Sequence, residues 1–231
     1  MIVCSTHEEW RHRITSSILK TLSTAIKLRG KASFLVSGGS TPRSIYEKLS
    51  GEEGLDWNRV HLALVDERWV DPDHQASNEK LIRETLLQGK PSASLFTEMK
   101  SDHATPHLAA DSINEAYQKL PFPFDVVLLG MGSDGHTASL FPFSTGLENA
   151  INTVDIVAPI TARKSSVTGN HLNRMTLTGP AIATAQSVIL ALKGEGKKIA
   201  YDQALNCEDI HAMPVSIFLG ADNLVTYWTE S

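Results

Sequence analysis

Cysteine is scarce in this chain: only Cys4 and Cys207 occur among 231 residues, and they lie far apart. Neither a disulfide framework nor a structural zinc site, which needs closely spaced cysteine pairs, is indicated. Long apolar runs are also absent, since no stretch reaches the roughly 18 residues that a membrane span needs. The first ten residues lack the basic and apolar regions of a signal peptide, so we expect a cytoplasmic protein that does not contact a membrane.

Basic residues are also fewer than acidic residues. The chain has 21 Lys and Arg against 26 Asp and Glu, a formal net charge of -5 at pH 7, and its basic residues are not clustered. A protein that binds nucleic acid or anionic lipid usually carries a basic patch, so we expect neither partner. An anionic ligand would have to be held by a local site.

Two common catalytic motifs are missing. The chain has no Gly-x4-Gly-Lys segment, which disfavours a nucleoside triphosphate as ligand. It also has no Gly-x-Ser-x-Gly segment, which disfavours a hydrolase that forms a covalent intermediate on serine.

The sequence that remains is that of a folded domain. Hydrophobic residues make up 42% of the chain, and a protein of this length can bury about 70% of the surface of its extended chain. No linker, repeat or charge block interrupts it. We therefore expect a single domain over residues 1–231.

Apolar runs alternate with segments of helical periodicity. Unbroken apolar runs are typical of buried parallel strands, and their alternation with helices predicts a three-layer, mostly parallel, Rossmann-like α/β sheet. Ligands of such sheets bind beyond the carboxyl ends of the strands. The expected strands are 32–36, 60–65, 124–129, 154–160, 175–178 and 188–192, with 215–219 as a last strand or a packed segment; the expected helices are 6–30, 45–49, 78–89, 106–120 and 195–205.

A glycine-rich loop with the sequence SGGSTPR follows the first of these strands at 37–43. Glycine lets the backbone approach an anion closely, Thr41 can cap the next helix, and Pro42 suits the first helical position. Free amides at a helix start favour a phosphate group. The loop is interpreted as a phosphate cradle, with an ordinary strand-to-helix turn as the alternative.

A second glycine-rich loop, GMGSDGH at 130–136, contains the Gly-x-Gly-x-x-Gly pattern of dinucleotide-binding proteins. Such a turn should open a full helix, but Pro142 ends any helix here within two turns. An acidic residue should follow the second strand, whereas Asp155 precedes it. We therefore do not expect a nicotinamide cofactor.

The same loop places Asp134 two residues before His136. A histidine that a carboxylate can orient is suited to general-base catalysis near neutral pH. The alternative is that Asp134 caps a short helix and His136 only packs against it.

A third polar segment, DERW at 66–69, follows the strand at 60–65. Its position predicts a loop that faces the ligand crevice. Arg68 suits an anionic or carbonyl oxygen and Asp66 suits sugar hydroxyls. A solvated loop with an internal ion pair is the alternative.

The other histidines give little indication of a metal site. His103 and His107 have the i, i+4 spacing of metal ligands on a helix, but Pro106 between them marks a helix start, so the two need not share a face. We interpret them as a surface pair and expect no metal ion and no cofactor.

Taken together, three segments resemble the 6-phosphogluconolactonase family, which shares a fold group with glucosamine-6-phosphate deaminase and ribose-5-phosphate isomerase. The segments occur in the family's order with nearly its spacing, and the resemblance extends over about residues 5–228. They read FLVSGGSTPRSIYEKL, VHLALVDERWVDPDHQASNEKLIRETLL and FDVVLLGMGSDGHTASLFP.

The resemblance implies hydrolysis of 6-phospho-D-glucono-1,5-lactone to 6-phospho-D-gluconate in the oxidative pentose phosphate pathway, with His136 as general base. It also implies that the first loop holds the phosphate, that Arg68 contacts the lactone, and that Arg174 and Lys197 reach the ligand. The candidate catalytic residues are His136, Asp134, Arg68 and Asp66; the candidate substrate-binding residues are Gly38, Gly39, Ser40, Thr41, Arg43, Gly132, Arg174 and Lys197.

Two other functions compete with this one. A deaminase or isomerase acting on an amino-sugar phosphate would use the same loops, but that family has a glutamate five residues after the histidine, where this chain has Phe141. A sugar-phosphate sensor that regulates transcription would be accompanied by a helix-turn-helix segment or a basic patch, and none is seen. The sequence does not decide the oligomeric state, and a monomer is the starting expectation.

Overall fold

The apolar runs of the sequence form the middle of a seven-stranded sheet. A computed structural model describes residues 1–231. All neighbouring strands in this sheet are parallel, in the order β1-β10-β9-β6-β2-β3-β5. The strands are β1 (Ile2–Cys4), β2 (Ala32–Val36), β3 (Val60–Leu64), β5 (Leu95–Thr97), β6 (Val126–Leu129), β9 (Ser187–Lys193) and β10 (Leu224–Thr229).

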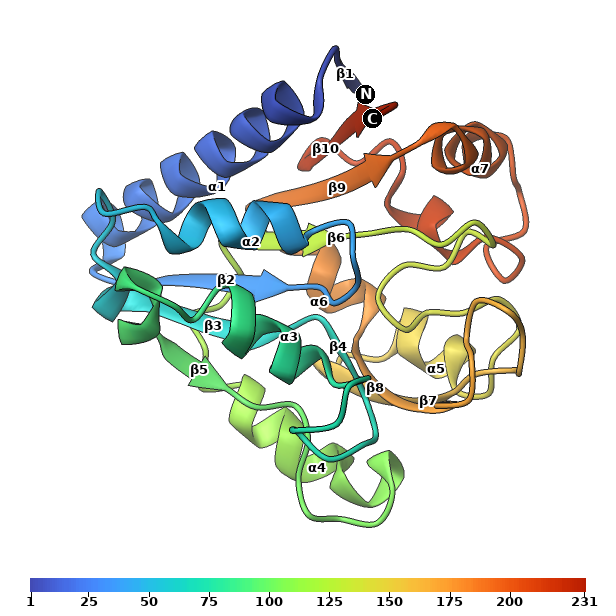
Figure 1. Cartoon of the computed structure of the whole chain (residues 1–231). Helices are drawn as coiled ribbons and strands as arrows, with labels where there is room; N and C mark the ends of the chain where they lie inside the picture. The colour runs from blue at the N-terminus through green and yellow to red at the C-terminus, as the bar shows by residue number, and fades with distance from the viewer.

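A smaller antiparallel sheet, ordered β4-β8-β7, lies beyond the end of β3. Helices flank the sheets, and the strand arrows of the large sheet point the same way (Figure 1), so the loops that follow these strands lie at one edge. None of the helices has the length and apolar composition needed to cross a bilayer. The remaining elements are β4 (Asp66–Arg68), β7 (Val157–Thr161), β8 (Asn173–Leu177), α1 (His7–Arg29), α2 (Arg43–Ser50), α3 (Asn78–Thr85), α4 (Pro106–Tyr117), α5 (Leu147–Asn152), α6 (Gly179–Ala183), α7 (Glu195–Leu205) and the 3-10 turns η1 (Trp57–Arg59), η2 (Lys90–Ala93) and η3 (Pro214–Phe218).

The predicted parallel α/β class is confirmed, and the reason is visible in the burial of the strands. Every residue of β2 and β6 is buried, because these central strands are covered on both faces. The long helix α1 contributes the stripe of Trp10, Ile14, Ile18 and Leu22, none of which is exposed to solvent. The buried apolar side chains form one continuous cluster of 58 residues. We accordingly retain a single domain over residues 1–231 as our proposal.

Several expected elements differ from the structure. Of the two alternatives for residues 215–219, the strand is wrong and the packed segment is confirmed: Pro214–Phe218 is a 3-10 turn in which Val215 and Phe218 are buried. The last strand is β10, which was not predicted. The strand expected from residue 154 begins at Val157, and Val154 is fully exposed. The three-residue edge strands β1 and β5 and the short helices α5 and α6 were also not predicted, because elements this short carry too few residues to show a period.

The segment 66–68 is a strand rather than the predicted loop. β4 pairs with β8 in antiparallel register, which sets Asp66 opposite Thr176 and Arg68 opposite Arg174. A polar strand of three residues shows no apolar pattern, so only its partner strand reveals it. This pairing places the polar residues that follow β3 beside β8, a strand more than a hundred residues later in the chain.

The centre of β4 is attached to the start of α3. Glu67 is 1% exposed, and its carboxylate accepts hydrogen bonds from the amides of Arg68, Asn78 and Glu79 and from the hydroxyl of Ser77, at 2.7–3.0 Å. Burial raises the pKa of Glu67 to about 7, although these hydrogen bonds lower it. The carboxylate thus satisfies amides that the first turn of α3 leaves unpaired, and it holds β4 against that helix.

Candidate active site

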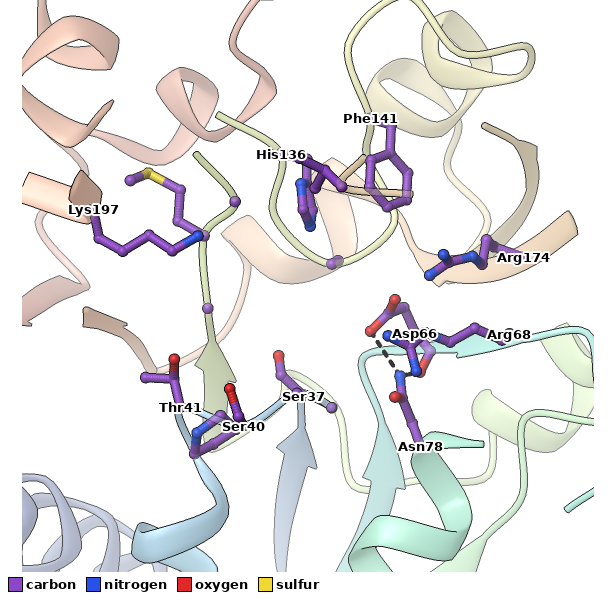
Figure 2. A pocket seen from close by; sticks show the side chains of 18 residues that line it. Ser37, Ser40, Thr41, Asp66, Arg68, Asn78, His136, Phe141, Arg174 and Lys197 are labelled. Carbon is purple, nitrogen blue, oxygen red and sulfur yellow. Dashed lines mark hydrogen bonds between the residues drawn. The ribbon is translucent and has the colours of Figure 1, made fainter. Parts of the chain in front are cut away.

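The three polar segments meet in one cleft at the carboxyl edge of the large sheet. The cleft has a volume of about 260 Å³, and Figure 2 shows side chains from all three segments turned toward it. Ten of the twelve candidate residues line it: Gly38, Gly39, Ser40, Thr41, Asp66, Arg68, Gly132, His136, Arg174 and Lys197.

The other two candidates do not line this cleft. Asp134 lies behind the imidazole of His136, on the side of Nδ1. Arg43 lines an adjoining polar hollow of about 230 Å³, which it shares with Arg68 and Lys80. Gly39 and Ser40 also line this hollow, and the substrate-binding role of Arg43 stays a prediction.

Asp134 and His136 form a hydrogen-bonded pair. Nδ1 of His136 lies 2.6 Å from Oδ1 of Asp134, and the same oxygen accepts the backbone amide of His136 at 3.2 Å. Burial alone would raise the pKa of Asp134, but the hydrogen bonds and the charge of His136 together lower it. An ionised Asp134 keeps the proton on Nδ1, so Nε2 is left with a lone pair. Figure 2 shows the ring directed into the cleft.

Gly132 leaves the space in which this pair fits. Its amide donates to the carbonyl of His136 at 2.8 Å, which closes the turn. A Cβ atom at Gly132 would stand 2.1 Å from Nδ1 of His136 and 2.3 Å from Oδ1 of Asp134. No side chain can be accommodated there without separating the two. The glycines of the Gly-x-Gly-x-x-Gly pattern therefore shape a turn around a histidine.

Phe141 packs on the ring of His136, with the ring centroids 4.2 Å apart and the planes tilted by 35°. The guanidinium carbon of Arg174 lies 5.2 Å from the centroid of the Phe141 ring. The imidazole is thus held by a hydrogen bond at Nδ1 and by an aromatic contact on one face. Phe141 was not among the candidate residues, because the sequence singled it out only as the place of a missing glutamate.

The two arginines of the cleft differ in how much of each guanidinium is free. Arg174 is 4% exposed and donates from Nε to the carbonyl of His171 at 2.6 Å and from Nη2 to that of Thr168 at 3.0 Å. Burial lowers the pKa of Arg174 to about 10, so it stays charged at neutral pH. Arg68 donates from Nη1 to the carbonyl of Ala76 at 2.6 Å, and its buried Nε has no partner. Arg68 thus keeps more capacity to bind a ligand oxygen.

Asp66 connects the segments around the cleft. It is 6% exposed, and its carboxylate accepts the hydroxyl of Ser139 at 2.5 Å and the side-chain amide of Asn78 at 3.3 Å. The side-chain amide of Asn78 also donates to the backbone carbonyl of Asp66 at 2.8 Å. Asn78 fills the space next to Gly38: a Cβ atom at Gly38 would lie 1.8 Å from Oδ1 of Asn78. Neither Asn78 nor Ser139 was predicted as a site residue, since neither stands in a recognisable motif.

Residues 38–41 form the opposite end of the cleft from Arg174. None of their four backbone amides donates a hydrogen bond within the chain. The predicted capping role of Thr41 is wrong: α2 begins at Arg43, Pro42 stands at the cap position in a helical conformation, and no side chain caps the helix. The Thr41 hydroxyl is consequently available, and it lines the cleft beside Ser40.

Lys197 of α7 extends from the other side toward this end of the cleft (Figure 2). Burial lowers the pKa of Lys197, whereas the charge of Asp134 raises it. An ammonium group opposite four free amides makes a region suited to a phosphate group, in a protein whose net charge is negative.

Comparison with known proteins agrees with this geometry. The family model described as glucosamine-6-phosphate isomerases/6-phosphogluconolactonase matches residues 5–228. The chain is 38% identical over 215 residues to the 6-phosphogluconolactonase of Pseudomonas aeruginosa. The aligned region covers 93% of this chain and 88% of that protein. This chain belongs to the glucosamine-6-phosphate isomerase/6-phosphogluconolactonase family.

Solved structures of the family show the same fold. The 6-phosphogluconolactonase of Shewanella baltica superposes with a TM-score of 0.92 at 40% identity, over 99% of this chain and 96% of that one. The 6-phosphogluconolactonase of Trypanosoma brucei superposes with a TM-score of 0.79 at 27% identity, over 99% and 95%.

Gly132→Ala is expected to lower kcat by about 10², because its Cβ must separate His136 from Asp134. Gly54→Ala is the matched control, since a Cβ at Gly54 meets nothing within 4 Å. The measurement is kcat on 6-phosphogluconolactone together with the melting temperature of each variant. Full activity in folded Gly132→Ala would show that the pair does not depend on this glycine.

Proposed function

We propose that His136 is the general base of this chain and that the cleft binds its substrate with C1 at His136 and the phosphate at residues 38–41. The activity is that of a 6-phosphogluconolactonase, which hydrolyses 6-phosphogluconolactone in the pentose phosphate pathway. The observation that carries the assignment of roles is the Asp134–His136 pair, which faces a cleft with free amides at one end and two arginines at the other.

The reaction begins when water attacks C1 of the lactone. Nε2 of His136 takes a proton from the water as the new C–O bond forms, and Asp134 stabilises the imidazolium through Nδ1. The carbonyl oxygen becomes an oxyanion, which the guanidinium of Arg68 on β4 would stabilise. The C1–O5 bond then breaks, the imidazolium returns its proton to the ring oxygen, and the acid product ionises to 6-phosphogluconate.

The phosphate end supplies orientation rather than chemistry. A phosphate at residues 38–41 would be held by free backbone amides, by Ser40 and Thr41 and by the ammonium of Lys197. These contacts lie away from C1 and persist unchanged as the ring opens, so they align the lactone with His136. Arg43, in the adjoining hollow, would act on the phosphate only as a more distant charge.

No observation favours the competing functions. Proton transfer between C1 and C2 in a deaminase or isomerase would use a carboxylate where Phe141 packs on His136. A sensor would need no general base. A cytoplasmic location, a monomeric state and the absence of nucleic-acid and membrane partners remain predictions, as do the absence of a metal and of a cofactor from the reaction.

His136→Ala is expected to lower kcat by about 10² or more, with little change in KM, because the general base is lost while the phosphate contacts remain. The assay follows acid release from freshly prepared 6-phosphogluconolactone and subtracts the spontaneous rate. Exposed His107→Ala is the control for loss of a histidine. An unchanged kcat in His136→Ala would remove His136 from the mechanism, whereas a wild-type rate equal to the spontaneous one would remove the activity itself.

Lys197→Ala is expected to raise KM about tenfold while kcat stays near that of the wild type, because the lysine binds the phosphate equally in the ground and transition states. The neighbouring Lys198 is a matched control, since it is ion-paired with Asp202 at 2.7 Å and does not line the cleft. Lys198→Ala should therefore leave both constants unchanged. A fall in kcat without a change in KM for Lys197→Ala would place the lysine at the reacting end instead.

A further inference from the structure

Both arginines of the cleft are held by loop backbone. Arg68 donates to the carbonyl of Ala76 at 2.6 Å, in the loop 69–77 that joins β4 to α3. Arg174 donates to the carbonyls of Thr168 and His171, in the loop 162–172 that joins β7 to β8. The second loop also places Val167 in the lining of the cleft. The direction of each guanidinium therefore depends on where its loop lies.

The two loops touch each other through a pair of histidines. The rings of His74 and His171 meet edge to face, with their centroids 5.0 Å apart and their planes at 73°. Nδ1 of His74 accepts the amide of Ala76 at 2.9 Å, so this ring is tied to the residue that holds Arg68. His171 is itself a residue that holds Arg174. One aromatic contact thus links the supports of both arginines.

The surroundings of this contact are cationic. The charged groups that act on the imidazole of His171 are His74 of the opposite loop, Arg174 of β8 and Arg68 of β4, with no carboxylate among them. Burial lowers the pKa of His171, and its electrostatic interactions with His74, Arg174 and Arg68 lower it further. A protonated His171 would be repelled by the guanidiniums of Arg174 and Arg68.

We propose that His74 and His171 form a clasp that holds loops 69–77 and 162–172 together, positions Arg68 and Arg174 for the lactone, and opens when His171 is protonated. The effect on catalysis rests on the proposed role of these arginines. Closure favours the neutral ring, because burial and the nearby guanidiniums of Arg174 and Arg68 lower the pKa of His171, and this lowering is relieved when the loops separate. Falling pH therefore shifts the loops toward the open state.

Replacement of His171 by phenylalanine separates packing from charge, because it keeps an aromatic ring at the contact and cannot be protonated. Repulsion between a protonated His171 and the guanidiniums of Arg174 and Arg68, partly screened by water, corresponds to about fivefold in an equilibrium. The substrate phosphate also titrates near pH 6. The informative quantity is therefore the KM of the wild type divided by that of His171→Phe at the same pH.

We expect this KM ratio to be near one at about pH 7.5 and to rise about fivefold at about pH 5.5. His171→Ala, which removes the contact, should raise KM already at the higher pH, and His107→Ala, on the exposed face of α4, should behave as the wild type at both. A ratio that does not change with pH would overturn the proposal.

Amide hydrogen exchange without substrate tests the clasp independently of any assignment of substrate contacts. Exchange in loops 69–77 and 162–172, corrected for its intrinsic pH dependence, should be faster in His171→Ala than in the wild type. It should also increase in the wild type, but not in His171→Phe, as the pH falls. Equal exchange in all three proteins would show that the histidines do not hold the loops. A wild type without lactonase activity but with this exchange pattern would contradict the proposed function and not the clasp.

Discussion

The hydrogen bond between Asp66 and Ser139 joins the parts of this molecule that chemistry requires to be together. The two residues are 73 positions apart in sequence, and the hydroxyl lies 2.5 Å from the carboxylate. Ser139 belongs to the loop that carries His136, and Asp66 begins the strand that carries Arg68. Asn78 extends the connection to the first glycine-rich loop, because it bonds to Asp66 and occupies the space beside Gly38. Asp66 therefore lines the cleft and also connects the segments that surround it.

The cleft divides into two ends with different tasks. Free amides, hydroxyls and one ammonium group lie at the end of residues 38–41, whereas a histidine and two arginines lie at the other. Binding energy gained at the first end can align a bond at the second, which is how a remote phosphate accelerates a reaction it takes no part in. The overall charge of -5 does not prevent this, because the cations converge locally.

Much of this arrangement could be predicted from the sequence because its parts are local. The strand β6 is an unbroken apolar run, β2 is interrupted only by Ser33, and the glycine-rich turns follow both strands directly. The pairing of Asp134 with His136 spans two residues and needs no knowledge of the fold. The family resemblance added the roles of Arg174 and Lys197, which no local pattern indicates.

The rest depends on contacts between distant segments. β4 is visible only through its pairing with β8, and Asn78 and Ser139 matter because folding places them on Asp66. Phe141 matters because folding packs it on the imidazole ring of His136. The capping role expected for Thr41 was wrong because the helix begins one residue later than a threonine cap would require.

The most direct test of the account is a crystal structure of the protein with 6-phosphogluconate bound. The account predicts the C1 carboxylate next to Nε2 of His136 and near Arg68, with the phosphate against the amides of residues 38–41 and the ammonium of Lys197. A ligand bound in the reverse direction, with its phosphate on Arg68 and Arg174 and its carboxylate away from His136, would contradict it.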